Sequence, residues 1–279
     1  MKLLSTGLAM GESPRWCNGR LWLCDWGAQE ILTIGVDGRW EVAVKVPFAL
    51  PFCIDWLLDG RLLIVAGREG RLLRQEPDGS LETHADLTQL STNAWNEIVV
   101  DGRGNAYVNA SGVIAMVTPD GRVRQVGDGG AFPNGMAVTP DNGTLILAES
   151  YARRLAAFDI APDGGLSNRR VWADLNGGVP DGICLDAEGA VWYADVPNKR
   201  CVRVRGGGEA LQTIELDRGG FACMLGGADG RTLFVVVNEW RGMDKIQEVS
   251  LKRTGQVLTI EAPAPAVGWP RQVITQLKI

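Results

Sequence analysis

The chain has a single histidine, His84, among its 279 residues, and this scarcity removes two common kinds of catalytic centre. A zinc site built from several histidines is excluded. A Ser-His-Asp triad would have to use His84, which lies in the charged segment LETHADL and is expected at the surface. The six cysteines include no CxxC pair, and most lie in strand-like segments, so we expect reduced, buried thiols.

An excess of basic residues and long apolar runs are also missing. The 28 Lys and Arg residues are outnumbered by 33 Asp and Glu residues, which argues against a nucleic-acid partner. No stretch approaches the roughly 20 apolar residues of a membrane helix. The apolar start is broken by Ser5, Thr6 and Gly7, which is not typical of a signal peptide. We predict a cytoplasmic protein with a small-molecule partner, and either a monomer or a homodimer is compatible with the sequence.

What the chain does contain is a repeat. Each unit has a turn glycine followed by an apolar strand, and these glycines are Gly19, Gly60, Gly104, Gly143, Gly189 and Gly230. Their spacing of 39 to 46 residues is typical of propeller blades with four short strands each. We therefore predict an all-β fold over residues 1–279, a single six-bladed β-propeller of antiparallel strands. We expect the N-terminal and C-terminal strands to close the ring together, which removes exposed sheet edges.

The repeat also predicts a site. The first strand of each blade lines the central channel, so equivalent positions on the six first strands form a ring. Seven to nine residues before the turn glycines, this ring contains Glu12, Cys53, Asn96, Asn134, Asp181 and Ala222. Two carboxylates and two amides that converge from four blades suit a hard cation. We predict Glu12, Asn96, Asn134 and Asp181 as its ligands.

Local alternatives exist for these residues. Asn96 also fits a turn asparagine that caps its own backbone, and the PNG and PDG motifs around Asn134 and Asp181 are common in turns. The turns of those two blades come later, however, at PDNG and DAEG. For substrate contacts we predict Asn96 together with Trp95, Cys53, Phe52 and Glu149, and whether Glu149, Ser150 and Tyr151 face the pocket or the opposite rim stays open.

Several long motifs now resemble a known family. They are GESPRW, NGMAVTPDNGTLILAES, FDIAPDGGLSNRRVWADL and VPDGICLDAEGAVWYAD, and together they resemble the SMP-30/gluconolactonase/LRE-like family of six-bladed propellers over essentially the whole chain. The resemblance implies one divalent cation, most often Ca²⁺, with Zn²⁺, Mg²⁺, Mn²⁺ and Fe²⁺ as alternatives. It implies ligands at Glu12, Asn96, Asn134 and Asp181.

One motif departs from that family. Sugar-lactonase members usually carry Arg-x-Asn-Asp in the third blade, where the arginine holds sugar hydroxyls. This chain has Ala94, Trp95, Asn96 and Glu97 there, without the arginine. The departure keeps the metal but puts a polyhydroxylated aldonolactone in doubt, and it is compatible with a less polar lactone or ester.

The resemblance implies a metal-dependent lactonase, a carboxylic-ester hydrolase that opens a lactone ring. A cation of this kind polarises a carbonyl oxygen. Asp181 is then expected to assist the attacking water as general base, although a metal-bound water that Asp181 only orients is the alternative. Two other functions compete: an esterase or phosphotriesterase on the same site, and a non-catalytic binding propeller with a structural cation.

Overall fold

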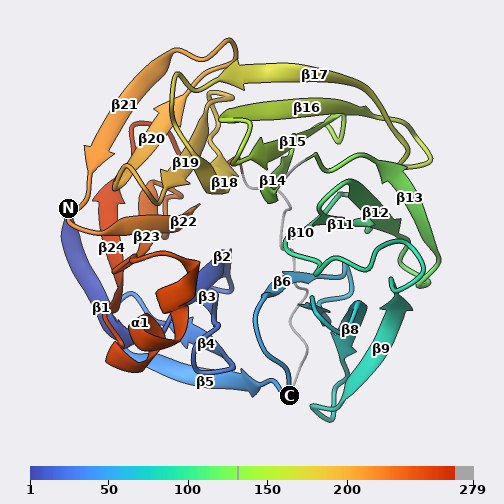
Figure 1. Cartoon of the computed structure of the whole chain (residues 1–279), viewed down its shortest axis with the longest axis horizontal. Coiled ribbons are helices and arrows are strands. Elements are labelled where there is room, and N and C mark those ends of the chain that lie inside the picture. Colours follow the sequence, from blue (N-terminus) through green and yellow to red (C-terminus); the bar gives the residue numbers. More distant parts are fainter. Residues whose placement is uncertain (131, 268–279) are drawn as a thin grey trace.

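The computed structural model describes residues 1–130 and 132–267, and it confirms the predicted fold. Six four-stranded antiparallel sheets stand in a ring around a central axis (Figure 1). The first strand of each blade lies nearest the axis and the fourth strand lies at the rim (Figure 1). The predicted geometry, in which equivalent first-strand positions face one channel, is therefore the geometry of the folded chain.

The strands of the first three blades follow the chain in order from the axis outward. Blade 1 contains β2 (Gly11–Cys17), β3 (Arg20–Asp25), β4 (Glu30–Ile34) and β5 (Trp40–Lys45). Blade 2 contains β6 (Phe52–Trp56), β7 (Leu62–Ala66), β8 (Arg71–Gln75) and β9 (Leu81–Asp86). Blade 3 contains β10 (Ile98–Val100), β11 (Ala106–Ala110), β12 (Val113–Val117) and β13 (Val123–Gly127).

Blades 4 and 5 repeat the pattern, and blade 6 combines both ends of the described chain. Blade 4 contains β14 (Pro133–Val138), β15 (Thr144–Glu149), β16 (Arg154–Ile160) and β17 (Leu166–Asp174). Blade 5 contains β18 (Pro180–Leu185), β19 (Val191–Asp195), β20 (Arg200–Val204) and β21 (Ala210–Glu215). Blade 6 contains β22 (Gly219–Gly226), β23 (Thr232–Asn238), β24 (Gly255–Glu261) and, outermost, β1 (Lys2–Leu8).

The ring closes as predicted. The N-terminal strand β1 pairs antiparallel with β24, with Leu3 opposite Leu258, so the two ends of the described chain share one sheet. Because β1 pairs with β24, the edge of β24 is not exposed, and β1 is the outermost strand of blade 6. Closure from both ends holds the first and last blades together.

The turn glycines have the backbone conformation that the repeat implied. Gly19, Gly60 and Gly189 have φ of 74°, 89° and 75°, in the left-handed region where a side chain is strained. In blade 4 the left-handed residue is Asn142, with φ of 56°, and Gly143 follows it. Asparagine tolerates this conformation better than most residues, so the blade 4 turn differs by one position.

The hydrophobic core lies between neighbouring blades. Inner strands such as β6 and β7 are buried along their whole length, whereas β5 and β21 at the rim are largely exposed. One buried cluster joins Leu63 of blade 2 to Val108 of blade 3, and another joins Ile146 of blade 4 to Val202 of blade 5. Side chains of one blade thus pack against the next blade, so each blade is stabilised by its neighbours.

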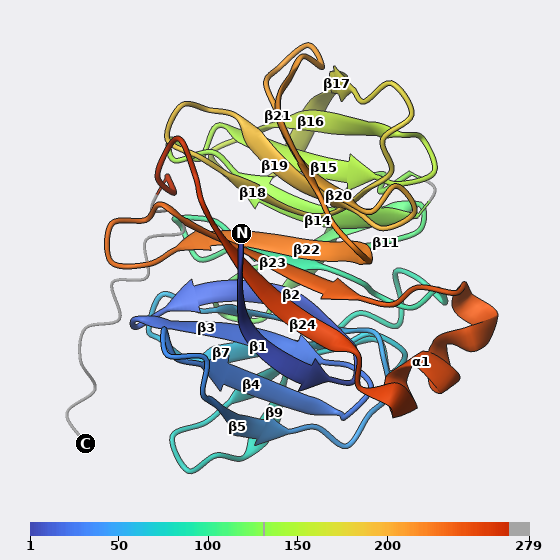
Figure 2. The ribbon, with the colours of Figure 1, turned by 90° about the vertical axis from the view of Figure 1, so that its left-hand side faces the viewer.

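One excursion interrupts the pattern. Between β23 and β24 the chain forms a short 3-10 helix, η1 (Met243–Lys245), and one α-helix, α1 (Ile246–Lys252). Figure 2 shows α1 at one face of the disc. Among the described residues, no helix is long and apolar enough to cross a bilayer.

Candidate active site

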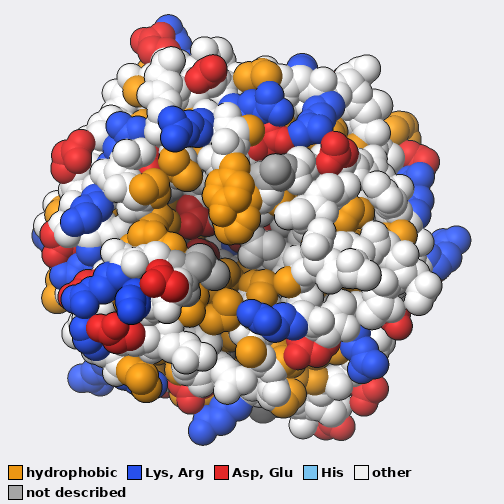
Figure 3. Space-filling model, in the orientation of Figure 1, with side chains coloured by type: hydrophobic (Ala, Val, Ile, Leu, Met, Phe, Trp, Pro, Cys, Tyr) orange, Lys and Arg blue, Asp and Glu red, His pale blue; other side chains and the backbone are white. Residues whose placement is uncertain are grey.

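The four predicted ligands lie together at one end of the channel. Glu12, Asn96, Asn134 and Asp181 all line one cavity of about 450 Å³. Figure 3 shows the disc from the face on which α1 lies, with a hollow at its centre that is ringed by hydrophobic side chains and has acidic atoms inside. Residues of four different blades therefore meet around one space, as the ring argument expected.

Bulges in the inner strands set the directions of these side chains. The pairing register shifts by one residue between Glu12 and Arg15, between Pro133 and Met136, and between Pro180 and Ile183. Blade 2, whose ring residue is Cys53, pairs β6 with β7 without such a shift. A bulge re-aims a side chain and commonly lies next to a functional site. In blades 1, 4 and 5 the predicted ligand lies within this irregular stretch.

Two small residues let the inner strands approach closely around the site. A Cβ on Gly135 would lie 2.6 Å from the Ile183 nitrogen, and a Cβ on Gly182 would lie 2.5 Å from the Ala222 Cβ. The glycines of the PNG and PDG motifs are therefore packing residues, because any side chain there would push neighbouring strands apart. Close packing brings Asn134 and Asp181 toward one another across the boundary between blades 4 and 5.

Hydrogen bonds fix the two amides. The Asn96 amide nitrogen donates to the Pro133 carbonyl at 3.0 Å and to the Asn134 Oδ1 at 3.3 Å. The Asn134 nitrogen donates to the Ser150 hydroxyl at 3.4 Å, and that hydroxyl donates to the Pro180 carbonyl at 2.7 Å. Both amide nitrogens are used as donors within the protein. The Asn96 Oδ1 is therefore available for a ligand, and the Asn134 Oδ1, which accepts the Asn96 hydrogen bond, has a second lone pair.

The two carboxylates lie near one another, and of the two Glu12 is buried whereas Asp181 is half-buried. Burial raises the pKa of Glu12 well above its ordinary value, and the Asp181 charge raises it further. Burial also raises the pKa of Asp181, and the charges of Glu97 and Asp195 add to this effect. The Ser13 N–H donates to the Glu12 Oε2 at 2.9 Å and opposes the shift only in part. Two neighbouring acidic groups with raised pKa values form a site that favours positive charge.

A second charged group lies next to this site. The Arg15 guanidinium donates to Glu97 at 3.1 Å and to the Ile98 carbonyl at 2.7 Å, and its Nε lies 4.0 Å from Asp55. Ser13, with φ of 49°, connects Glu12 to Glu97. Its N–H donates to Glu12, and its hydroxyl donates to Glu97 at 3.4 Å. Left-handed backbone at a buried serine is strained, and such strain clusters at functional sites.

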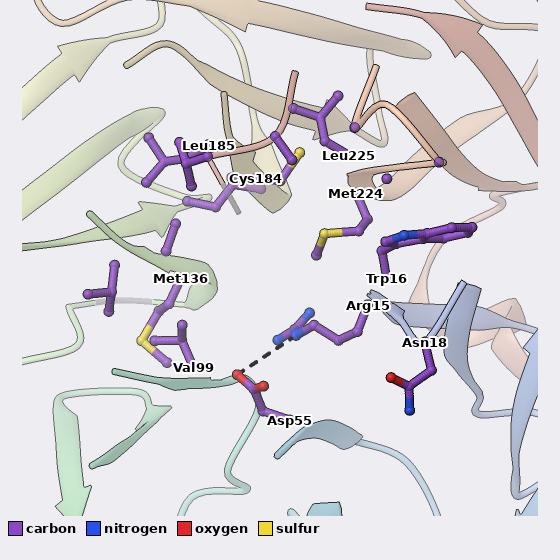
Figure 4. A pocket seen from close by; sticks show the side chains of 18 residues that line it. Arg15, Trp16, Asn18, Asp55, Val99, Met136, Cys184, Leu185, Met224 and Leu225 are labelled. Carbon is purple, nitrogen blue, oxygen red and sulfur yellow. Dashed lines mark ion pairs between the residues drawn. The ribbon is translucent and has the colours of Figure 1, made fainter. Parts of the chain in front are cut away.

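A different cavity lies at the other end of the inner strands. It has a volume of about 420 Å³ and is lined by later residues of those strands, such as Val99, Val138, Leu185 and Leu225. Figure 4 shows its side chains, with the ion pair of Arg15 and Asp55 at one side and mostly apolar groups elsewhere. Arg15 therefore separates the acidic site from an apolar space at the opposite mouth of the channel.

Four of the predicted substrate residues do not line the cavity that contains Glu12 and Asp181. Trp95, Cys53 and Phe52 are buried in the packing between blades, and none of them lines this cavity. Glu149 is buried as well, with its carboxylate held by Arg154 at 2.5 Å and by Arg169. Their side chains pack or pair within the protein, so we do not include them in the proposed substrate pocket, whereas Asn96 lines it.

Two residues whose direction the sequence left open line the site, and a third residue was not singled out from the sequence. Ser150 and Tyr151, left open above, both line the cavity. Asn109 holds the site from behind, because its amide nitrogen donates to the Asn134 carbonyl at 2.8 Å and its oxygen accepts the Glu97 N–H at 3.2 Å. The signal was present in the repeat, since Asn109 and Ser150 both lie near the ends of second strands, in YVNA and LAES.

The donor set fits a hard divalent cation. Glu12, Asn96, Asn134 and Asp181 each bring side-chain oxygen to the cavity, and oxygen ligands of mixed charge are those that Ca²⁺ prefers. Residues 1–130 and 132–267 contain no cluster of three or more His, Cys, Asp and Glu side chains around a common point. The proposed site has two carboxylates and two amides. It therefore contains only two residues of the types His, Cys, Asp and Glu, and such a cluster of three is not expected there.

Comparison with known proteins supports the resemblance noted above. The profile of the SMP-30/Gluconolactonase/LRE-like region matches residues 10–239. Regucalcin of Danio rerio is 28% identical over 59% of this chain and 61% of its own length, and regucalcin of Xenopus laevis is 26% identical over 92% of both chains. A pentonolactonase of Haloferax volcanii is 26% identical over 78% of this chain and 84% of that protein.

A solved structure agrees in fold. The crystal structure of a calcium-binding protein, regucalcin from Agrobacterium tumefaciens, superposes with a TM-score of 0.72 at 22% identity. The match covers 95% of this chain and 94% of that chain. At this identity the likeness concerns the propeller itself, and the chemistry has to be argued from the residues in the cavity.

Proposed function

The chain belongs to the SMP-30/gluconolactonase/LRE-like family, which includes lactonases, and from this premise we propose that it is a metal-dependent lactonase. The reaction is the hydrolysis of a cyclic ester at the cavity that Glu12, Asn96, Asn134 and Asp181 line. In this proposal a divalent cation, Ca²⁺ first among the candidates, is held by these four side chains.

One observation carries the proposal. Oxygen-bearing side chains of four separate blades line one cavity, and two of them are carboxylates with raised pKa values, of which Glu12 is buried and Asp181 is half-buried. Burial of two like charges is costly unless a cation compensates them. If the four residues had a purely structural role, the unfavourable free energy of placing the two carboxylates together would not be compensated.

The bound cation would supply a positive charge that polarises the lactone carbonyl. The protein contributes the remaining steps. The amides of Asn96 and Asn134 are held by Pro133 and Ser150 and therefore keep fixed positions beside the carbonyl. Asp181 orients the attacking water and accepts its proton at a carboxylate oxygen, while Glu12 stays ionised to balance the charge.

Asp181 is assigned as base by its place. It lies in β18, its carboxylate faces the cavity, and Pro180 beside it is held through its carbonyl by Ser150 at 2.7 Å. Both carboxylates accept a hydrogen bond, Glu12 from the Ser13 N–H and Asp181 from Asn134, but Asp181 is the more accessible of the two. Arg15 is engaged by Glu97 and Ile98, so it serves to balance charge below the site.

The test is a metal-depleted assay. The purified protein is freed of metal with a chelator and assayed against lactones, a linear carboxyl ester and a phosphotriester, with Ca²⁺, Mg²⁺, Mn²⁺, Zn²⁺ and Fe²⁺ restored one at a time. We expect lactone turnover only with metal, and a loss of at least about 100-fold in kcat for Asp181→Asn. The variant Asp217→Asn changes an exposed carboxylate on the protein surface and should keep full activity.

Three results would count against the proposal. Turnover that survives complete metal removal would exclude the cation from the reaction. Hydrolysis of the phosphotriester or the linear ester with no lactone turnover would assign the site to one of the competing hydrolases. Absence of all turnover at every metal would favour a binding propeller.

A further inference from the structure

The walls of the candidate active site are apolar above the four ligands. One wall is a packed cluster in which Met10, Val196 and Phe221 are buried, with Trp26, Trp240 and Ile246 packed against them. All six side chains line the cavity. Phe221 and Trp240 meet edge to face with ring centroids 5.7 Å apart, which fixes the orientation of both rings.

Another part of the cavity wall carries an exposed aromatic pair. The rings of Phe132 and Tyr151 stack with centroids 4.5 Å apart and planes 15° apart, and both residues line the cavity. Tyr151 is 70% exposed and Phe132 is 42% exposed. Exposed aromatic groups at the mouth of a cavity cost solvation in the free protein, and apolar surface of this kind marks a place where a ligand binds.

Besides the four predicted ligands, the non-aromatic polar side chains in the described lining of this cavity are Arg68, Ser111 and Ser150. Apart from Glu12 and Asp181, the one charged side chain in the described lining is Arg68, which is exposed and whose Nε donates to the Leu50 carbonyl at 2.7 Å. Ser150 already donates its hydroxyl proton to Pro180. A polyhydroxylated ring would therefore place several hydroxyl groups against carbon, where they lose hydrogen bonds to water without replacement.

We propose that the substrate is a lactone with a flat or alkyl apolar body rather than an aldonolactone. This inference rests on the proposed function, since it names the substrate class of the same site. The lactone carbonyl points down toward Glu12, Asn96, Asn134 and Asp181. Its apolar body lies between the Phe132–Tyr151 pair and the wall that Trp26, Phe221 and Trp240 form.

The first experiment compares substrates at saturating Ca²⁺. Initial rates are measured for δ-valerolactone, its homologues with longer alkyl chains, dihydrocoumarin and D-glucono-δ-lactone. We expect kcat/KM to rise roughly 3- to 10-fold per buried methylene at first, and dihydrocoumarin to exceed the gluconolactone by about 100-fold. A higher kcat/KM for the gluconolactone would overturn this inference while leaving the lactonase function in place.

The second experiment measures binding without turnover. Calorimetry uses β-tetralone, a ketone with the bicyclic outline of dihydrocoumarin, and D-gluconate as the polar comparison. We expect β-tetralone to bind and gluconate to bind at least about 10-fold more weakly. If no lactone is hydrolysed yet β-tetralone binds in the cavity, the lactonase function fails and the apolar character of the site stands.

A variant links both readouts to the aromatic pair. Tyr151→Ser removes an exposed ring and leaves the core intact, so the fold should persist. We expect KM for dihydrocoumarin and the dissociation constant of β-tetralone to rise about 5- to 20-fold with little change in kcat. Trp40→Ser, at an exposed aromatic of the rim strand β5, is the matched control and should change neither. If Tyr151→Ser bound β-tetralone as tightly as the wild type, this would contradict the proposed binding position of the substrate beside the Phe132–Tyr151 pair.

Discussion

Glu12→Gln tests the electrostatic account because it should change stability in opposite ways without and with calcium. Glu12 is buried, and both burial and the Asp181 charge raise its pKa. Glutamine has the same shape and keeps an oxygen that can accept the Ser13 N–H at 2.9 Å. The variant therefore removes a buried acidic group without removing its hydrogen bond, and the metal-free variant should melt no lower than the metal-free wild type.

Calcium should stabilise only the wild type. A ligand that binds the native state at 100 times its Kd adds about 2.7 kcal/mol of stability, and each kcal/mol raises the Tm of a chain of this size by roughly 2–4 °C. We expect a rise of about 5–10 °C for the wild type and less than about 2 °C for Glu12→Gln at the same calcium concentration.

The assay is thermal unfolding followed by circular dichroism, with and without Ca²⁺. Glu41→Gln is the control, because Glu41 is exposed on β5 and pairs with Arg20 at 3.5 Å, far from the cavity. This control should keep the full calcium shift. A full calcium shift in Glu12→Gln would refute the assignment of Glu12 as a ligand, and a large loss of stability in the metal-free variant would refute the electrostatic reasoning.

Three further predictions concern the buried groups around the site. Arg15→Met leaves the buried Asp55 and Glu97 without their cation and should lower the free energy of unfolding by about 3–5 kcal/mol in urea titrations, against at most about 0.5 kcal/mol for the exposed Arg241→Met; equal losses would contradict the role of Arg15. Burial raises the pKa of Asp55 from 3.8 to about 6, so the folded chain takes up this proton before the unfolded chain does, and the Asp55 contribution to stability is lost as pH rises through about 6. The stability of Asp55→Asn relative to the wild type should accordingly improve by up to ~3 kcal/mol between about pH 4 and pH 7, and a relative stability independent of pH would exclude this effect. All six cysteines are buried, and burial raises the pKa of the Cys17 thiol to about 12, so Ellman's reagent should label the native protein only as fast as it unfolds. Rapid labelling of any thiol in the native protein would contradict that burial.

The fold was predictable because one backbone event recurs six times. Each repeat needs a tight turn between its first and second strands, and a glycine or asparagine with positive φ supplies it. The spacing of these turns predicts the blades, and the blades predict which strands face the axis. The four oxygen-bearing residues at equivalent ring positions could be found from that spacing alone, and they line one cavity.

The residues that contact the substrate could not be predicted from the spacing of the repeats. Phe52 and Cys53 occupy a ring position by count, but β6 is a regular strand, and its side chains pack toward the neighbouring blades. The bulges that re-aim Glu12, Asn134 and Asp181 depend on how each strand pairs with its neighbour, which sequence spacing does not reveal.

The apolar wall of the cavity was hidden for a different reason. Trp240 and Ile246 belong to the excursion between β23 and β24, which has no counterpart in the other repeats. Phe132 precedes β14 and Tyr151 follows β15, so their stacking joins residues that are 19 positions apart in the sequence. Because these contacts arise from tertiary packing, only the structure shows that they line the same cavity as the acidic residues.

The most direct measurement is the anomalous scattering of a crystal grown with Ca²⁺ or soaked in Mn²⁺. The account predicts one strong peak on the channel axis, roughly 2.3–2.6 Å from side-chain oxygens of Glu12, Asn96, Asn134 and Asp181 for calcium. A peak elsewhere in the molecule, or a fully occupied cation that these four side chains do not touch, would contradict it.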